Sequence, residues 1–334
     1  MVNHTGKTDT ARSGRTAGTL CIWSADPIAH WIVQAIHASG VAVVSVGSPL
    51  TTVRNCLGIE DGESTDLRVF SSAMRGIPLL FVGFGDADAR AAVASNHPIV
   101  FTTEPWIGRF DSRNNSTAEV SLPGFAIDGR LWQAGEIFSQ SASPDIAQIS
   151  SLGSTEHGSI LARIQEASTP LIRWMGVPER VSASVGGPRI QRSWADQPDS
   201  ASRSMRLWTG SFALTCQYSD GRAGLIMASN QHPAWTRSAL ACGSFGAVRV
   251  DDATLQWRDP SNELLENTLP SASEWASTDL VSIAAHTLAT ALDELSFTRA
   301  HHEKTRAFME AACLSAFTLE SESPFKLAEI LGDA

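Results

Sequence analysis

The chain opens with a strand–helix–strand pattern, which limits its possible folds more than any other feature. Residues 19–23 form a short apolar run of the kind found in buried strands. Residues 28–39 then carry apolar side chains at the spacing of an amphipathic helix, and Gly40 stands at its expected end. Residues 41–46 are a second apolar, β-branched run. The pattern predicts a βαβ unit with parallel strands covered on both faces.

Further elements extend this pattern along the chain. Strands are expected over residues 79–84 and 98–103, with a helix from Asp88 to Ser95 between them. This order of strands and helices predicts a Rossmann-like layer over about the first hundred residues. We expect an irregular stretch next, and then the elements at residues 158–175 (helix), 181–185 (strand), 212–218 and 223–228 (a hairpin), and 278–297 and 304–317 (helices).

The predicted fold class is α/β, with a Rossmann-like large domain and a smaller α+β domain. The expected organisation is a disordered arm over 1–17, the large domain over 18–185, a polar linker over 186–206, the small domain over 205–307, and a C-terminal segment over 308–334 that returns to the large domain.

Composition excludes several classes of function. With a net charge of -10, the chain lacks the basic balance of a general nucleic-acid binder. Its only lysines are Lys7, Lys304 and Lys326, so a ligand site that depends on lysine is nearly excluded. No apolar run approaches the ~20 residues of a spanning helix, and the N-terminal residues do not resemble a secretory signal. The 5 cysteines lack paired spacing and are expected to be reduced thiols. We therefore expect a cytoplasmic protein.

Two short motifs suggest chemistry that we do not predict. Gly83-Phe84-Gly85 resembles the start of a dinucleotide fingerprint, but the third glycine is missing and no acidic residue ends the second strand. We expect an ordinary strand-to-helix turn there, without nicotinamide binding. His301-His302-Glu303 is expected to be a solvated helix face, and no metal site is predicted.

The most reactive group of residues is Ser154, Glu156 and His157, immediately before the helix over 158–175. A hydroxyl, a carboxylate and an imidazole lie there within four residues, at a helix N-terminus that favours anions. The structural alternative is a helix cap, with Ser154 or Thr155 as the N-cap residue and Glu156 in the first turn.

Several segments, in their order and spacing, resemble family III CoA-transferases, the group that also holds α-methylacyl-CoA racemases and carnitine dehydratase-like proteins. The segments that carry this resemblance are residues 39–49, 75–80, 153–176, Asp220-Gly221 with Trp235 and Gly243, and 323–327. The resemblance implies a Rossmann-like large domain with a small domain, two interlocked chains, and an acyl-CoA thioester as substrate.

The resemblance also assigns the candidate site residues. The transferases attack the thioester with an aspartate, and Ser154 stands at that position, so Glu156 with His157 would have to replace the nucleophile. Arg54 and Arg75 are the nearest candidates to bind the phosphates of coenzyme A. The implied function is CoA transfer or isomerisation at a non-standard site, by a homodimer or by a heterodimer with a paralogue.

Two alternatives remain open. The aspartate, the racemase histidine and the CoA-facing lysine of the family are all replaced, which favours a non-catalytic (pseudoenzyme) subunit or regulatory scaffold that pairs with itself or with an active paralogue. A third possibility is a protein that binds another ligand in the same cleft between domains.

Overall fold

The computed structural model describes most of the chain, and all statements below concern that part. The described residues are 19–25, 41–53, 65–83, 87–93, 96–103, 118–121, 129–155, 158–187, 208–251, 254–268 and 295–331. The predicted arm over 1–17, the helix over 28–39 and nearly all of the predicted linker lie outside the described residues.

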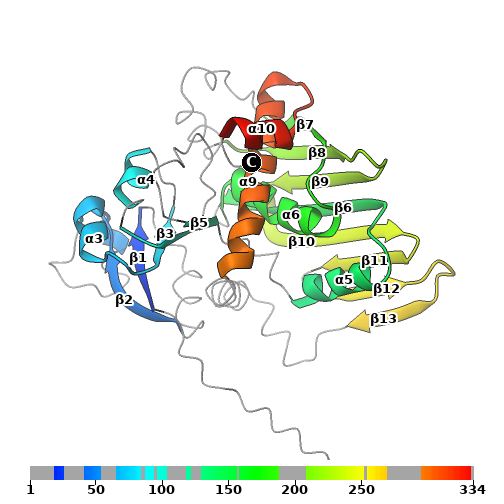
Figure 1. The fold of residues 1–334 in the computed structure, drawn as a ribbon, viewed down its shortest axis with the longest axis horizontal. Helices are drawn as coiled ribbons and strands as arrows, with labels where there is room; N and C mark the ends of the chain where they lie inside the picture. Colours follow the sequence, from blue (N-terminus) through cyan, green and yellow to red (C-terminus); the bar gives the residue numbers. More distant parts are fainter. Residues whose placement is uncertain are drawn as a thin grey trace, which may run out of the picture.

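The first part of the chain forms a five-stranded parallel sheet in the order β2-β1-β3-β4-β5. Its strands are β1 (Thr19–Ser24), β2 (Ala42–Gly47), β3 (Leu79–Val82), β4 (Ile99–Thr102) and β5 (Ala118–Ser121). Helices α3 (Leu67–Ala73) and α4 (Ala87–Val93) belong to the same unit (Figure 1). The prediction of a Rossmann-like layer is confirmed. Strand order reverses at β1, which makes the β1–β3 boundary the topological switch point of the sheet.

Aromatic packing closes the core between the sheet and helix α3. Trp23 of β1 and Phe70 of α3 are both buried, with ring centroids 5.4 Å apart. Gly47, the last residue of β2, is the register partner of Trp23. A Cβ atom at Gly47 would lie 2.6 Å from Phe70 Cδ2 and 2.7 Å from Trp23 Cε3. The two rings therefore leave no space for a side chain at residue 47.

The second unit is an eight-stranded sheet in the order β13-β12-β11-β10-β6-β9-β8-β7. Only the pair β6–β9 is parallel; the other pairs are antiparallel. The strands are β6 (Ile146–Ser154), β7 (Arg180–Gly186), β8 (Ser211–Gln217), β9 (Ala223–Ser229), β10 (Gln231–Gly243), β11 (Gly246–Asp251), β12 (Leu255–Arg258) and β13 (Leu264–Thr268).

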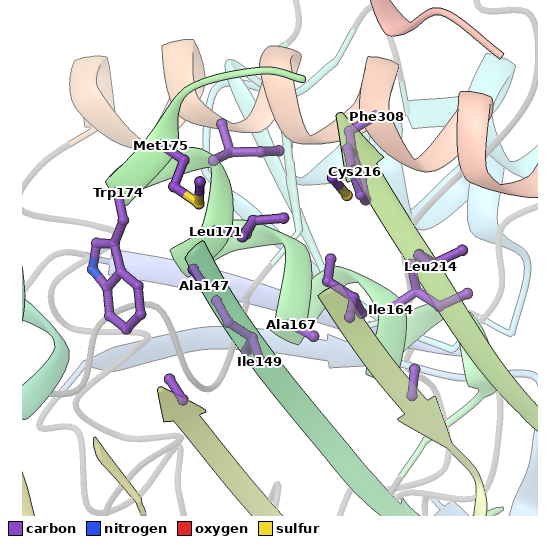
Figure 2. Close-up of a cluster of buried hydrophobic side chains, with 14 of the residues drawn as sticks. Ala147, Ile149, Ile164, Ala167, Leu171, Trp174, Met175, Leu214, Cys216 and Phe308 are labelled. Carbon is purple, nitrogen blue, oxygen red and sulfur yellow. The ribbon is translucent and has the colours of Figure 1, made fainter. Parts of the chain in front are cut away.

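Helices cover one face of this second sheet. Helix α6 (Ile160–Met175) packs on β6 and β9, while α5 (Gly129–Gln140) contacts α6 and β11. The long helix α9 (Leu295–Thr318) contacts α6, β7 and also β5 of the parallel sheet, and α10 (Pro324–Leu331) packs against α9 (Figure 1). Figure 2 shows Leu171 and Ile164 of α6 between the strands and Phe308 of α9.

The other face of the eight-stranded sheet has exposed apolar side chains. Ile146, Met227 and Leu240 on strands β6, β9 and β10 are 58%, 40% and 41% exposed. The strand registers place them on one face with Gln148 and Ser150, opposite the face that packs on α6. No described helix covers this central area, which carries no charged side chain among the described residues of these three strands.

The second sheet contains strands that the sequence did not predict. Most of residues 146–154 were expected to be irregular, yet they form β6 between β9 and β10. No strand was predicted within residues 231–268, which contain four more strands. These strands contain many small and polar residues because one face is open, so they lack the apolar signal that marks a buried strand. No helix in the described part is both long and apolar enough to cross a membrane.

Replacing Gly47 by alanine should destabilise the fold. The new methyl group would overlap Trp23 and Phe70, and overpacking of this kind costs about 1–3 kcal/mol. Gly186→Ala is the matched control, because Gly186 also ends a strand but its Cβ would meet no atom closer than 3.9 Å. Thermal unfolding should show a lower midpoint for Gly47→Ala only. Equal midpoints for both variants would contradict the packing described here.

Candidate functional site

The carboxyl edge of the parallel sheet is the first candidate site. In open α/β sheets, ligands bind outside the carboxyl ends of the strands at the switch point. Here the Ala25 N–H donates to Val82 O at 2.9 Å, which holds the ends of β1 and β3 together. Gly83 follows β3 with φ 103°, and its N–H donates to Thr103 Oγ1 at 3.1 Å. The ends of β1, β3 and β4 thus present backbone and hydroxyl groups on one edge.

The residues at this edge differ from the standard dinucleotide fingerprint. That fingerprint places three glycines in the turn after β1, where the pyrophosphate binds, and an acidic residue about 20 residues later, which binds the ribose. β1 ends at Ser24, and the sequence continues as Ala25-Asp26-Pro27-Ile28-Ala29, which contains no glycine and lies outside the described residues from Asp26 onward. The end of β2 is Gly47-Ser48-Pro49, without a carboxylate. The sequence at these two places therefore does not match the standard fingerprint.

The glycine motif of the sequence lies after a different strand. Gly83-Phe84-Gly85 follows β3, whereas the topology assigns the phosphate turn to the residues after β1. The strand order was the missing information, because the sequence alone does not say which strand lies at the switch point.

The predicted site residues are not brought together among the described residues. Glu156, His157 and Arg54 lie outside the described residues. Ser154 is the last residue of β6, paired in register with Gln231. Helix α6 is capped by Ser159, whose side chain accepts from the Ala162 N–H at 3.3 Å, so neither Ser154 nor Thr155 is the cap.

Arg75 lies at the opposite edge of the parallel sheet from the switch-point crevice. It follows α3 and precedes β3, at the amino ends of the strands, and its Nε donates to Asn96 Oδ1 at 3.1 Å. A phosphate bound at the carboxyl edge would be out of its reach.

A buried polar cluster, which sequence reasoning missed, lies between β6, α6 and β10. Its members are Ser151, Arg163, Glu166, Trp235 and Arg237, and it is called the Glu166 cluster below. Ser151 Oγ and Trp235 Nε1 donate to Glu166 Oε2 at 2.6 and 3.1 Å, and Arg163 Nη2 lies 3.1 Å from Oε1. The guanidinium carbons of Arg163 and Arg237 lie 4.6 and 4.8 Å from the centroid of the Trp235 ring.

The geometry of the Glu166 cluster indicates a structural role for its carboxylate. Both oxygens of Glu166 already have partners within the chain, and the residue is only 5% exposed. A general base needs a carboxylate oxygen that faces the substrate. The cluster therefore holds α6 against β6 and β10. In the sequence, Arg163 and Glu166 are three residues apart on a predicted helix, a spacing that by itself suggests only an ion pair on the helix surface.

The described cysteines are all free thiols. Burial raises the pKa of Cys21 and of Cys216 to about 12, so neither thiol is ionised near neutral pH. This agrees with the prediction of reduced thiols and gives these two residues no nucleophilic role.

Comparison with known proteins reveals a shared fold. No protein-family model and no curated protein matches the sequence. Among solved structures, an oxidoreductase from Sinorhizobium meliloti has a TM-score of 0.66 at 11% identity, covering 92% of this chain and 99% of the other. An oxidoreductase from Agrobacterium radiobacter, in complex with NAD+, L-tartaric acid and magnesium, has a TM-score of 0.59 at 15% identity, covering 93% and 100%. The myo-inositol 2-dehydrogenase from Lactobacillus plantarum has a TM-score of 0.61 at 12% identity, covering 92% and 99%.

This chain has the fold of those oxidoreductases. The resemblance to family III CoA-transferases is therefore wrong, and so are the CoA-transferase fold and the function inferred from it, with its non-catalytic alternative. Coenzyme A and acyl-CoA are withdrawn as the expected ligands, because the structures that match include NAD-binding oxidoreductases. The sequence identities between this chain and the matching structures are 10–15%, so these matches show a shared fold alone. The segments behind the resemblance are mostly strand–turn–helix junctions, which any Rossmann-like layer contains.

Substituting Glu166 with glutamine should destabilise the second unit strongly. The change keeps the side-chain volume but leaves Arg163 beside a neutral amide in a buried site, and a broken buried pair costs about 3–5 kcal/mol. Glu329→Gln, at an exposed position of α10, should change stability by less than about 0.5 kcal/mol. Denaturant unfolding followed by circular dichroism compares the two. A similar stability for both variants would mean that the Glu166 cluster contributes little.

Proposed function

We propose that this protein is an oxidoreductase that uses a nicotinamide dinucleotide and acts on a small polyhydroxylated substrate. The observation that carries the proposal is the match to oxidoreductases over 92% of this chain and 99% of theirs, so that both sheets of the chain have counterparts. Three of the structures are named as inositol dehydrogenases, which supports a polyol as the substrate class. In such a reaction the nicotinamide exchanges a hydride with a carbon of the substrate.

The parallel sheet supports the same proposal through its topology. The strand order places a switch point between β1 and β3, the position at which open α/β sheets bind nucleotide cofactors. The residues after β1 and β2 do not match the fingerprint, so no catalytic step is assigned to the cofactor. A cytoplasmic location agrees with a nicotinamide-linked reaction and stays a prediction.

Direct binding tests the proposal. The chain has 10 tryptophans, and reduced nicotinamide accepts excitation energy from nearby indole rings, so titration with NADH or NADPH should quench tryptophan emission in a saturable way. Mixtures of the protein with NAD+ or NADP+ and a panel of inositols and sugar alcohols should then form reduced cofactor. Absence of saturable quenching by either reduced cofactor up to about 1 mM, a concentration that reveals even weak sites, would contradict the proposal.

We further propose that the protein forms a homodimer through the open face of the eight-stranded sheet. Neighbouring strands lie ~4.8 Å apart, and each residue extends a strand by ~3.3 Å. One face of a sheet of eight strands, each about seven residues long, therefore has an area of roughly 800 Å². That is about the area each partner contributes to a stable interface. The uncharged centre of the face, with Ile146, Met227 and Leu240, suits a second copy of the same surface.

Leu240→Arg should convert the dimer to a monomer, because it replaces an apolar side chain of that face by a second positive charge directly beside Arg249. Leu319→Arg is the control, since Leu319 is 75% exposed in the link between α9 and α10. Light scattering after size-exclusion chromatography measures the mass. A monomeric wild-type protein, or a dimer that persists in Leu240→Arg, would contradict this interface.

A further inference from the structure

We infer that the open face of the eight-stranded sheet packs on the same face of a second copy around a two-fold axis that runs across the strands, so that Arg249 of each copy pairs with Asp251 of the other. The inference rests on the homodimer proposed above and states how its two faces fit together. The axis lies in the plane between the two sheets, midway between two rows of side chains. The residues that occupy these rows carry the inference.

The strand registers align the side chains of the open face in rows that cross the sheet. The first row, from strands β9, β6, β10 and β11 in that order, contains Leu225, Gln148, Leu240 and Arg249. The second row, from the same strands, contains Met227, Ser150, Ser238 and Asp251. Two contacts agree with one shared face, because Gln148 Nε2 donates to Met227 Sδ at 3.7 Å and the Oγ atoms of Ser150 and Ser238 lie 2.7 Å apart.

A two-fold axis across the strands exchanges these two rows between the copies. In an interface made by one surface with itself, residue i of one copy meets residue j of the other, and j meets i. With the axis midway between the rows, each strand lies over the same strand of the second copy and runs in the opposite direction. Its first-row residue then meets its own second-row residue. Sheets packed face to face lie about 10 Å apart, a distance that side chains from both sheets fill together.

Strand β11 places opposite charges in the two rows. Arg249 is exposed and Asp251 is partly exposed, while Val248 and Val250 beside them are buried on the other face. Exchange of the rows brings each arginine opposite an aspartate, which gives two ion pairs per dimer. An arrangement that placed residue 249 opposite itself would instead bring two arginines together, and like charges across an interface oppose association.

Strand β6 reads the same in both directions on this face. Its open-face residues are Ile146, Gln148, Ser150 and Leu152, which are apolar, polar, polar and apolar in order. When β6 lies in the opposite direction over the β6 of a second copy, Ile146 meets Leu152 and Gln148 meets Ser150. Each side chain of the strand therefore meets one of its own kind, as in the cores and polar parts of specific interfaces.

Strand β9 adds an apolar contact under the same axis. Leu225 of the first row meets Met227 of the second row, and both side chains are accessible on this face. On β10, Leu240 meets Ser238, which is a mixed contact. A single position of the axis therefore matches apolar with apolar, polar with polar and positive with negative on β9, β6 and β11 (Figure 1).

Reversal of one charge at a time tests the inference. Arg249→Asp leaves two acidic residues on β11, and Asp251→Arg leaves two basic ones, so each variant alone should raise the dissociation constant of the dimer at least about a hundredfold. An equal mixture of the two variants should form a mixed dimer, because both contacts then join aspartate to arginine. Lys326→Asp, an exposed charge reversal on α10, is the control and should leave the dimer unchanged. Light scattering after size-exclusion chromatography measures the mass.

A second pair of variants covers a loss of folding. Asp251 Oδ1 also accepts the Thr254 N–H at 2.7 Å, so circular dichroism must show that Asp251→Arg is folded. If it is not, Leu225→Lys and Met227→Glu decide the question in the same way. Their mixture should form a dimer at least about tenfold tighter than either variant forms alone, because lysine then meets glutamate.

The outcomes separate this inference from the proposal on which it rests. A dimer that persists in Arg249→Asp, or a pair of folded variants whose mixture forms no mixed dimer, would overturn the position of the axis and leave the proposed dimer intact. A monomeric wild-type protein would contradict the dimer itself, and the inference would fail with it.

Discussion

The packing of helix α6 between the eight-stranded sheet and helix α9 is the contact on which the second unit depends. Fifteen of its 16 residues are buried, so the helix has almost no solvent face. Its apolar side chains fill the space over β6 and β9, while Glu166 joins it to Ser151 and Trp235 through hydrogen bonds. Because α9 contacts both α6 and β5, the same helix pair also connects the second unit to the parallel sheet.

Whether a strand could be predicted from the sequence depends on whether one or both of its faces are buried. Strands β1 to β4 of the parallel sheet are largely apolar and were predicted close to their observed positions. β10 contains Pro233 and alternates small with polar residues, since one of its faces is open, and it was not recognised as a strand. The register of β6 between β9 and β10 depends on contacts between segments about 80 residues apart, which no local pattern encodes.

The candidate site was harder to predict than the fold, for two physical reasons. Ser154, Glu156 and His157 are close in sequence, but closeness does not place side chains on the edge of a sheet where a ligand binds. The edge that matters is defined by strand order, and Ser24, Gly47 and Gly83 meet there only after two parallel pairings have formed. The CoA-transferase resemblance failed for a related reason, because turns are shared by many unrelated folds.

The fit between Gly47, Trp23 and Phe70 also constrains how this part of the sequence can change during evolution. A carboxylate at residue 47 requires a smaller residue at 23 or 70, so the three positions cannot change one at a time without loss of stability. Homologues of this chain should accordingly fall into two groups: those with a glycine opposite a bulky ring, and those with an acidic residue opposite a small one.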